Sequence, residues 1–232
     1  MKVTITKEVF RRFNPKFKIA FIKIEEADNN SKLKESAHLL KEVSDLIKLT
    51  FNKEELKNHH MISTWTTAQE EFGKDAKHYH TSVEVLMKKV LSGKKIITKN
   101  VIENITNHIS LKHIIPIGTD NYEKIDGNLT FKISKGKEKP NMIQTVKKGA
   151  LICCDQNEKN NLLSTKFDTW KNKRTGINKK SKNVLIHIEA LPPITTKKFN
   201  EIVKETTELV KTFTNGKVTK LILDQKNNSG EI

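Results

Sequence analysis

The sequence is poor in cysteine and contains no long uninterrupted run of apolar residues. Its two cysteines are the adjacent Cys153 and Cys154, so a fold framed by disulfides is excluded and a reducing cytoplasm is the expected location. A membrane span is also excluded, because no stretch of about 18 apolar residues occurs. The first ten residues lack the apolar core of a signal peptide, which again favours a cytoplasmic protein.

Motifs for nucleotide binding and for covalent catalysis are missing too. The sequence has no P-loop, no G-x-G-x-x-G and no G-x-S-x-G, so neither a nucleotide-binding enzyme nor a hydrolase with a nucleophile elbow is supported. Cys153 and Cys154 lie in an apolar run and would point to opposite faces of a strand. We therefore expect both to be small buried apolar side chains.

Histidine spacing gives little support to a metal site. His78 and His80 would share one face of an extended segment and could begin a zinc site, but no third ligand is evident. His108 and His113 are five residues apart and do not share a helical face. We expect neither a metal nor a cofactor.

Positive charge is what the chain has in excess, with 43 Lys and Arg against 27 Asp and Glu and a net charge of +16. Arginine occurs only at Arg11, Arg12 and Arg174, and the abundance of Lys, Asn and Ile is typical of an AT-rich genome. The surplus is nevertheless uneven, because residues 135–182 hold 13 basic and only 4 acidic residues. Such a local positive field attracts polyanions.

The densest part of this region is residues 170–182, with six cations, no acid and one tryptophan. Lysine and arginine bind phosphates, while an unpaired base can stack on an aromatic ring. We therefore predict an RNA-binding surface made of Lys171, Lys173, Arg174, Lys179, Lys180 and Trp170. The alternative is a solvated lysine-rich loop that Trp170 anchors to the core.

Apolar periodicity predicts helices and strands in irregular order. Helices are expected near 8–13, 31–50, 52–73, 82–93, 102–113 and 196–214, and strands near 3–5, 17–24, 129–133, 150–154, 162–167, 184–188 and 218–223. Candidate N-caps are Ser31, Ser82, Thr195 or Thr196, and Asn52, which forms a capping-box pattern with Glu55. Residues 224–232 are expected to be a frayed polar tail. The irregular order favours an α+β class: one domain over residues 1–223, with a mixed, mostly antiparallel sheet that the first and last strands could share, flanked by helices.

Several short motifs, taken in chain order, resemble one known family. They are Trp65, Glu71-Phe72-Gly73, 77–86, 104–107, Ile115-Pro116, 124–127, Gly136-Lys137-Glu138, 150–155 and 184–190. Together they resemble the B3/B4 domain, the editing module of the bacterial phenylalanyl-tRNA synthetase β subunit. The likeness is greater to the free-standing B3/4-domain proteins, and it covers nearly the whole chain.

The resemblance implies hydrolysis of the ester that joins a wrong amino acid to its tRNA, without any aminoacylation. It implies tRNA, through its aminoacylated 3′ end, as the partner. The composition predicts no membrane association, and the sequence gives no sign of an obligate protein partner. Free-standing members are similar to proteins that remove residues such as the arginine analogue canavanine. The alternative from another class is a non-catalytic RNA- or amino-acid-binding module of the same fold.

The resemblance also implies site residues. When the motifs are aligned, the position of an editing-site histidine of the synthetase module corresponds to Gly118. The position of the module's editing-site glutamate corresponds to His187, or to Glu189 after a shift of two residues. The activated ester needs only an oriented water and hydrogen-bond donors for the oxyanion, and we expect this pocket where the 102–113 helix meets the 184–190 strand. The implied catalytic residues are Asn107, His187 and Glu189, and the implied substrate-binding residues are Thr106, Gly118 and Asp120.

Overall fold

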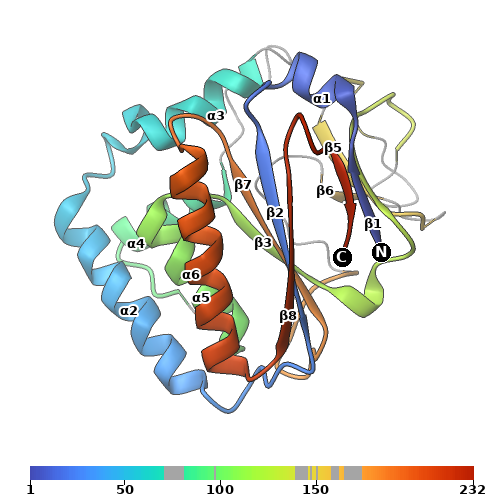
Figure 1. Cartoon of the computed structure of the whole chain (residues 1–232). Helices are drawn as coiled ribbons and strands as arrows, with labels where there is room; N and C mark the ends of the chain where they lie inside the picture. The colour runs from blue at the N-terminus through green and yellow to red at the C-terminus, as the bar shows by residue number, and fades with distance from the viewer. Residues whose placement is uncertain are drawn as a thin grey trace.

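The strands form two sheets, and a group of helices covers the outer face of one of them (Figure 1). This arrangement comes from a computed structural model, which describes residues 1–70, 81–96, 98–138, 146, 148–149, 151–157, 162–164 and 174–232. One sheet has the strand order β3-β7-β2-β8, and the other has the order β6-β5-β4-β1-β9. Neighbouring strands are antiparallel except β1 and β4. The α+β class is confirmed, with two sheets in place of one mixed sheet.

The expected elements appear in the expected order, but the strands at 117–121 and 229–231 were not predicted. The helix expected from Asn52 is instead a short turn at Leu56–Asn58 followed by a helix from His60, so Asn52 is not its N-cap. The strands are β1 (Lys2–Ile5), β2 (Lys18–Glu25), β3 (Ile117–Asn121), β4 (Leu129–Ile133), β5 (Leu151–Cys154), β6 (Leu162–Ser164), β7 (Val184–Ala190), β8 (Lys217–Leu223) and β9 (Ser229–Glu231). The helices are α1 (Lys7–Arg12), α2 (Leu33–Thr50), η1 (Leu56–Asn58), α3 (His60–Glu70), α4 (Ser82–Leu91), α5 (Val101–His113), η3 (Tyr122–Lys124) and α6 (Thr196–Thr214). None of the helices in the described ranges is both long and apolar enough to cross a bilayer.

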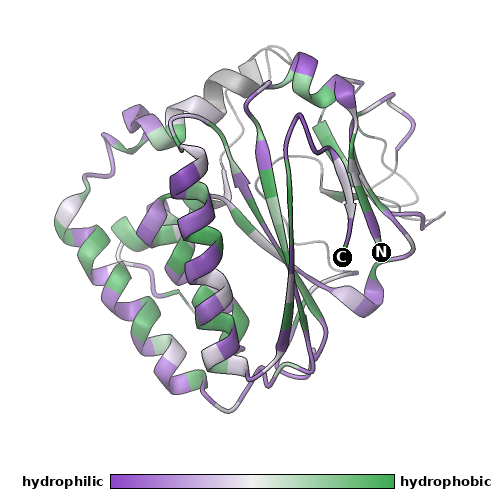
Figure 2. Ribbon diagram, viewed as in Figure 1, coloured by the Kyte–Doolittle hydropathy of each residue, from purple (hydrophilic) through white to green (hydrophobic). Residues whose placement is uncertain are grey.

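The four-stranded sheet is buried on both faces because its central strands alternate between two cores. Phe21 of β2 meets Phe131 of β4 between the sheets, with ring centroids 5.9 Å apart. The next residue, Ile22, faces the other way into a core that it shares with α5 and α6. Figure 2 shows apolar and polar residues mixed along α2 and α6, as expected for helices with one face packed and the other solvated.

The start of α2 differs from the expectation. Its N-cap is Lys32, which makes no side-chain cap bond, so the prediction of Ser31 as the cap is wrong. A carboxylate oxygen of Asp28 instead accepts hydrogen bonds from the backbone N–H groups of Asn30 and Ser31. This Asp turn holds residues 28–31 in a non-helical conformation before α2 begins.

The predicted caps of α4 and α6 differ in outcome. Thr81, and not Ser82, caps α4, because its hydroxyl accepts from the backbone N–H of Glu84. Thr81 and Ser82 are adjacent and both carry a hydroxyl group, so the sequence pattern alone does not show which of them is the cap. The cap of α6 is Thr195, one of the two predicted candidates, and it accepts from the backbone N–H of Lys198.

The prediction that residues 224–232 fray is wrong. Strand β9 pairs with β1, and the side-chain amide of Asn228 donates to the backbone carbonyl of Ile5 at 2.8 Å. The ammonium of Met1 donates to the carbonyl of Ile232 at 2.9 Å. The last predicted strand, β8, lies in the other sheet, so β9 and not β8 is the late partner of the first strand.

Candidate functional site

Three ionisable side chains are buried on the face of the four-stranded sheet that looks toward the second sheet. His187 and Glu189 are on β7 with 1% and 0% of their surface exposed, and Asp120 is on β3 with 3% exposed. Alternation puts His187 and Glu189 on the same face as Leu185, which packs between the sheets. The strand register places Gly118 opposite His187 and Asp120 opposite Leu185. The sheet therefore brings four of the implied site residues together.

His187 and Glu189 form a short hydrogen bond. The two atoms, Nδ1 and Oε1, are 2.6 Å apart, and the Nε2 of His187 lies 4.0 Å from Asp120 Oδ2. Burial lowers the pKa of His187 to about 4, although the nearby Asp120 carboxylate acts in the opposite direction. The ring is therefore neutral at pH 7. With Glu189 ionised, Nδ1–H donates to its carboxylate and the acceptor lone pair of the neutral ring is at Nε2.

Asp120 is held by a threonine from a distant segment. The hydroxyl of the fully buried Thr175 donates to Asp120 Oδ1 at 2.5 Å, and the carbonyl of Thr175 accepts from the backbone N–H of Asn121 at 2.7 Å. Burial raises the pKa of Asp120, while His187, Thr175 and Arg174 each lower it. These contacts fix the Asp120 side chain beside the His187 ring.

Arg174 belongs to an ion-pair network and does not lie on an open surface. Its Nη2 is 2.6 Å from Asp155 Oδ2, its Nη1 is 3.4 Å from Asp126 Oδ2, and Nη1 also donates to the carbonyl of Lys124 at 2.7 Å. Sequence analysis assigned this arginine to RNA and missed Asp155 and Thr175. No local signal pointed to this network, because Asp155 and Asp126 are 19 and 48 residues away from Arg174 in the sequence.

Thr106 and Asn107 lie on α5, on the opposite side of the sheet from His187. The helix packs on the sheet through Ile105 and Ile109, which are fully buried in one core with Ile186 and Ile188 of β7. The hydroxyl of Thr106 donates within the helix to the carbonyl of Ile102 at 2.9 Å. The predicted cleft between this helix and β7 is therefore wrong, because packed isoleucine side chains fill the contact.

Apart from Arg174, the described part of the predicted RNA surface is the turn at residues 178–182. Lys179 and Lys180 are exposed. The side chain of Asn178 accepts from the backbone N–H of Lys180, and the hydroxyl of Ser181 accepts from the backbone N–H of Asn178. The side-chain amide of Asn29 joins this turn to the segment before α2 through the carbonyl of Asn178, at 3.0 Å. Trp170, Lys171, Lys173, His78 and His80 lie outside the described residues.

The adjacent cysteines behave as buried apolar groups, as predicted. Both are free, and they point to different clusters: Cys153 lies between the sheets and Cys154 packs with Ile152. Burial raises the pKa of Cys154 to about 12, and burial together with nearby acidic groups raises the pKa of Cys153. Neither thiol is a nucleophile at neutral pH. Within the described ranges, no three His, Cys, Asp or Glu side chains are grouped to hold a metal ion.

The B3/4 domain model matches residues 64–224 of the chain, which leaves β1, β2 and α2 outside the matched range. A crystal structure of an N-terminal fragment of the phenylalanyl-tRNA synthetase β-subunit from Pyrococcus horikoshii is similar, with 10% sequence identity and a TM-score of 0.46. The comparison covers 95% of this chain and 53% of that one, so this chain spans about half the length of that fragment. No curated protein matches the sequence.

Proposed function

Because this chain belongs to the B3/4-domain family, whose model matches residues 64–224, we propose that it is a trans-acting deacylase of mischarged tRNA. The observation that carries the proposal is the buried pair of His187 and Glu189 on β7, with Nδ1 and Oε1 2.6 Å apart. This strand resembles the one that carries the editing-site glutamate in the synthetase module. In this proposal, Nε2 of the neutral His187 ring is an oriented hydrogen-bond acceptor that is buried away from bulk water.

The chemistry asks little of the protein because an aminoacyl ester is already activated. Water attacks the ester carbonyl, the bond to the terminal ribose oxygen breaks, and that oxygen leaves as a hydroxyl. A pKa of about 4 makes His187 a weak base, so its Nε2 is suited to orient the water or the substrate's amino group by accepting a hydrogen bond. Glu189 fixes the ring. Orientation of this kind contributes about 7–11 kcal/mol in well-aligned reactions.

The turn at residues 178–182 supports binding of the tRNA backbone. Lys179, Lys180 and Lys182 are exposed there, on a turn that internal hydrogen bonds hold in shape. Phosphate contacts of this kind position a nucleic acid without reading its sequence. The substrate within the proposal is a tRNA that carries a wrong or non-proteinogenic residue, with canavanine as one candidate.

A non-catalytic amino-acid- or RNA-binding module of the same fold is the second candidate. The observation that favours it is the near-complete burial of Asp120, His187 and Glu189, since a satisfied polar network is often only structural. Gly118 at the position of the synthetase module's histidine favours it as well.

A deacylation panel separates the two candidates. Purified protein is mixed with tRNAs that carry correct and incorrect labelled amino acids, including an arginine tRNA charged with canavanine, and release of the label is followed. We expect at least one mischarged tRNA to be hydrolysed, and His187→Asn to slow this about 100-fold or more. His108→Asn is the matched control, because His108 is a half-buried histidine on α5 that bonds the carbonyl of Leu39. Inertness across the panel with tRNA binding retained would leave the binding module.

A further inference from the structure

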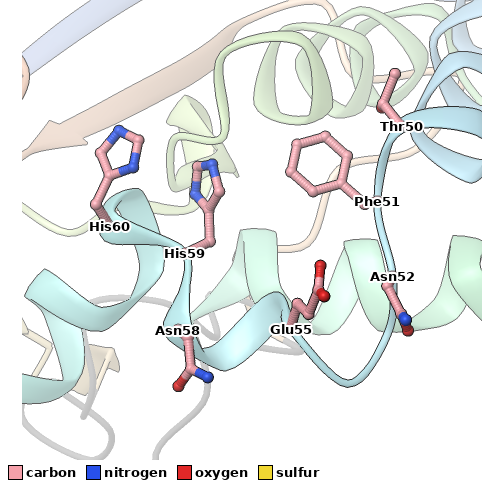
Figure 3. Close-up of a pocket in the computed structure, with 7 residues that line it drawn as sticks. All are labelled: Thr50, Phe51, Asn52, Glu55, Asn58, His59 and His60. Carbon is pink, nitrogen blue, oxygen red and sulfur yellow. The ribbon is translucent and has the colours of Figure 1, made fainter.

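A hollow of about 520 Å³ lies in the segment that connects α2 to α3. None of its lining residues belongs to the proposed active site on β3 and β7. Its walls come from residues 50–60, around the short η1 turn. Figure 3 shows the rings of Phe51, His59 and His60 and the carboxylate of Glu55 on the same side of this segment. The side chains of Asn52 and Asn58 point away from these rings.

The three rings form a continuous aromatic wall. The imidazoles of His59 and His60 are stacked, with centroids 4.5 Å apart and planes at 29°. The ring of Phe51 meets His59 edge-on, at 5.4 Å and 68°. Partial burial and the neighbouring His60 lower the pKa of His59, so this ring is uncharged at neutral pH. His60 is exposed, which leaves one ring of the stack open to a ligand.

The charges along residues 53–57 are balanced, and Glu55 is the one among them that lines the hollow. Lys53 and Lys57 are exposed on the segment that links α2 to α3, and the carboxylate of Glu55 lies between them in sequence. Glu54 is exposed as well, so the segment is not a strong positive patch like residues 170–182. The hollow therefore offers an aromatic face and a carboxylate acceptor, with balanced charge around them in the sequence.

We infer that this hollow binds an unpaired nucleobase of single-stranded RNA. A base is planar and stacks on histidine and phenylalanine rings, which is how proteins hold splayed-out bases. Glu55 is an acceptor for the exocyclic amino group of cytosine or adenine, which uracil lacks. Lys53 and Lys57 are exposed on the same segment, and their long side chains are the cations nearest in sequence for flanking phosphates. The inference does not depend on the deacylase activity, because it concerns binding alone.

The test is fluorescence anisotropy of labelled single-stranded hexanucleotides of cytidine and of uridine with the full-length protein. We expect the cytidine strand to bind about fivefold tighter than the uridine strand, as for one extra hydrogen bond. His60→Ala should weaken binding of the cytidine strand about tenfold, because one stacking ring is lost. Glu55→Gln should remove most of the preference for cytidine. His38→Ala is the matched control, because His38 is an exposed histidine about 18 Å away along α2.

Salt dependence gives a second readout. Two phosphate contacts to a single strand correspond to a slope of about −1.4 in log affinity against log salt. The double variant Lys53→Gln, Lys57→Gln should flatten the dependence by that amount and leave the cytidine preference in place. His60 and Glu55 are exposed, so these variants are expected to fold, and their thermal unfolding is compared with wild type.

Unchanged cytidine affinity in His60→Ala would overturn the inference, and so would equal affinity for the two strands in wild type. If His60→Ala changes only the oligomeric state in sedimentation, the hollow is a contact between copies of the chain and the inference is wrong. Deacylation is scored separately. Loss of oligonucleotide affinity in His60→Ala supports the inference even if no mischarged tRNA is hydrolysed.

Discussion

His187 on β7 lies directly opposite Gly118 on β3, the position on which the synthetase module's editing histidine falls by resemblance. Residues opposite one another in an antiparallel pair share a face, with Cβ positions about 4.5–5.5 Å apart. The imidazole of His187 therefore stands beside the backbone of Gly118. The glycine at position 118 therefore does not leave this face of the sheet without an imidazole.

Burial of His187 predicts a loss of stability in mild acid. The unfolded residue takes up a proton as the pH falls below about 6.5, whereas the folded one does so only near its pKa of about 4. The stability that this residue contributes is present above pH 6.5 and is lost as the pH falls toward 4. The loss reaches about 3 kcal/mol at pH 4.

Urea unfolding of wild type and His187→Gln at pH 7, 6, 5 and 4 checks this loss, because the difference cancels the contributions of other histidines. NMR titration of the His187 imidazole in the wild type gives the folded pKa directly. Protonation of the folded ring near pH 6.5, or parallel pH profiles for the two proteins, would contradict the prediction.

The ion pair of Arg174 and Asp155 predicts a stability effect that an RNA-binding arginine would not have. The carboxylate of Asp155 is fully buried, so Arg174→Ala leaves a charge without its main counterion. We expect a loss of about 3 kcal/mol in the free energy of unfolding. Lys179→Ala, in the exposed turn, should change it by less than about 0.5 kcal/mol. If Arg174→Ala and Lys179→Ala both lower the free energy of unfolding by less than about 0.5 kcal/mol, the ion pair of Arg174 with Asp155 does not stabilise the fold.

Lys179 and Lys180 predict a change in the salt dependence of tRNA binding. Neutralising both to Gln should weaken binding and reduce the slope of log affinity against log salt by about 1.8, since each phosphate contact on a duplex contributes about 0.9. Lys204→Gln, Lys211→Gln on α6 makes the same charge change elsewhere on the surface. If both double variants behave alike, net charge alone attracts the RNA and the turn is not its binding surface.

Strand β9 predicts that the last residues matter for stability. Ending the chain after Asp224 removes the pairing of β9 with β1 and the bond from Asn228 to the carbonyl of Ile5. We expect a loss of more than about 1 kcal/mol in unfolding by urea, as when several hydrogen bonds of a sheet are removed. Asn228→Ala tests the side-chain bond alone and should account for part of the loss. If the truncated chain has the same free energy of unfolding as the full chain, residues 225–232 do not stabilise the fold.

Local patterns predicted much of the fold and one part of the site. Alternation in residues 184–188 predicted β7, and the same alternation correctly put His187 and Glu189 on one face. Helices with clear apolar stripes, such as α6, were predicted to within a few residues. These features depend on residues close in the sequence, which is why periodicity reveals them.

What the sequence did not reveal depends on contacts between distant residues. Periodicity shows that α5 has an apolar face, but not which side of a sheet this face covers, so Thr106 was placed on the wrong side of β7. The meeting of Asp120 with Thr175 depends on the ladder of β3 and β7 and on a loop 55 residues away. Strand β9 is short and polar, and it is held by pairing with the other end of the chain.

The most direct test compares two variants on opposite faces of the sheet in a single-turnover deacylation assay with tRNA in the bound state. His187→Asn lies on the face between the sheets, and Asn107→Ala lies on the helical side. We expect the first to lower the hydrolysis rate about 100-fold or more with tRNA affinity unchanged, and the second to leave the rate within a few-fold of wild type. A rate that depends on Asn107 and not on His187 would contradict a deacylase site on β7.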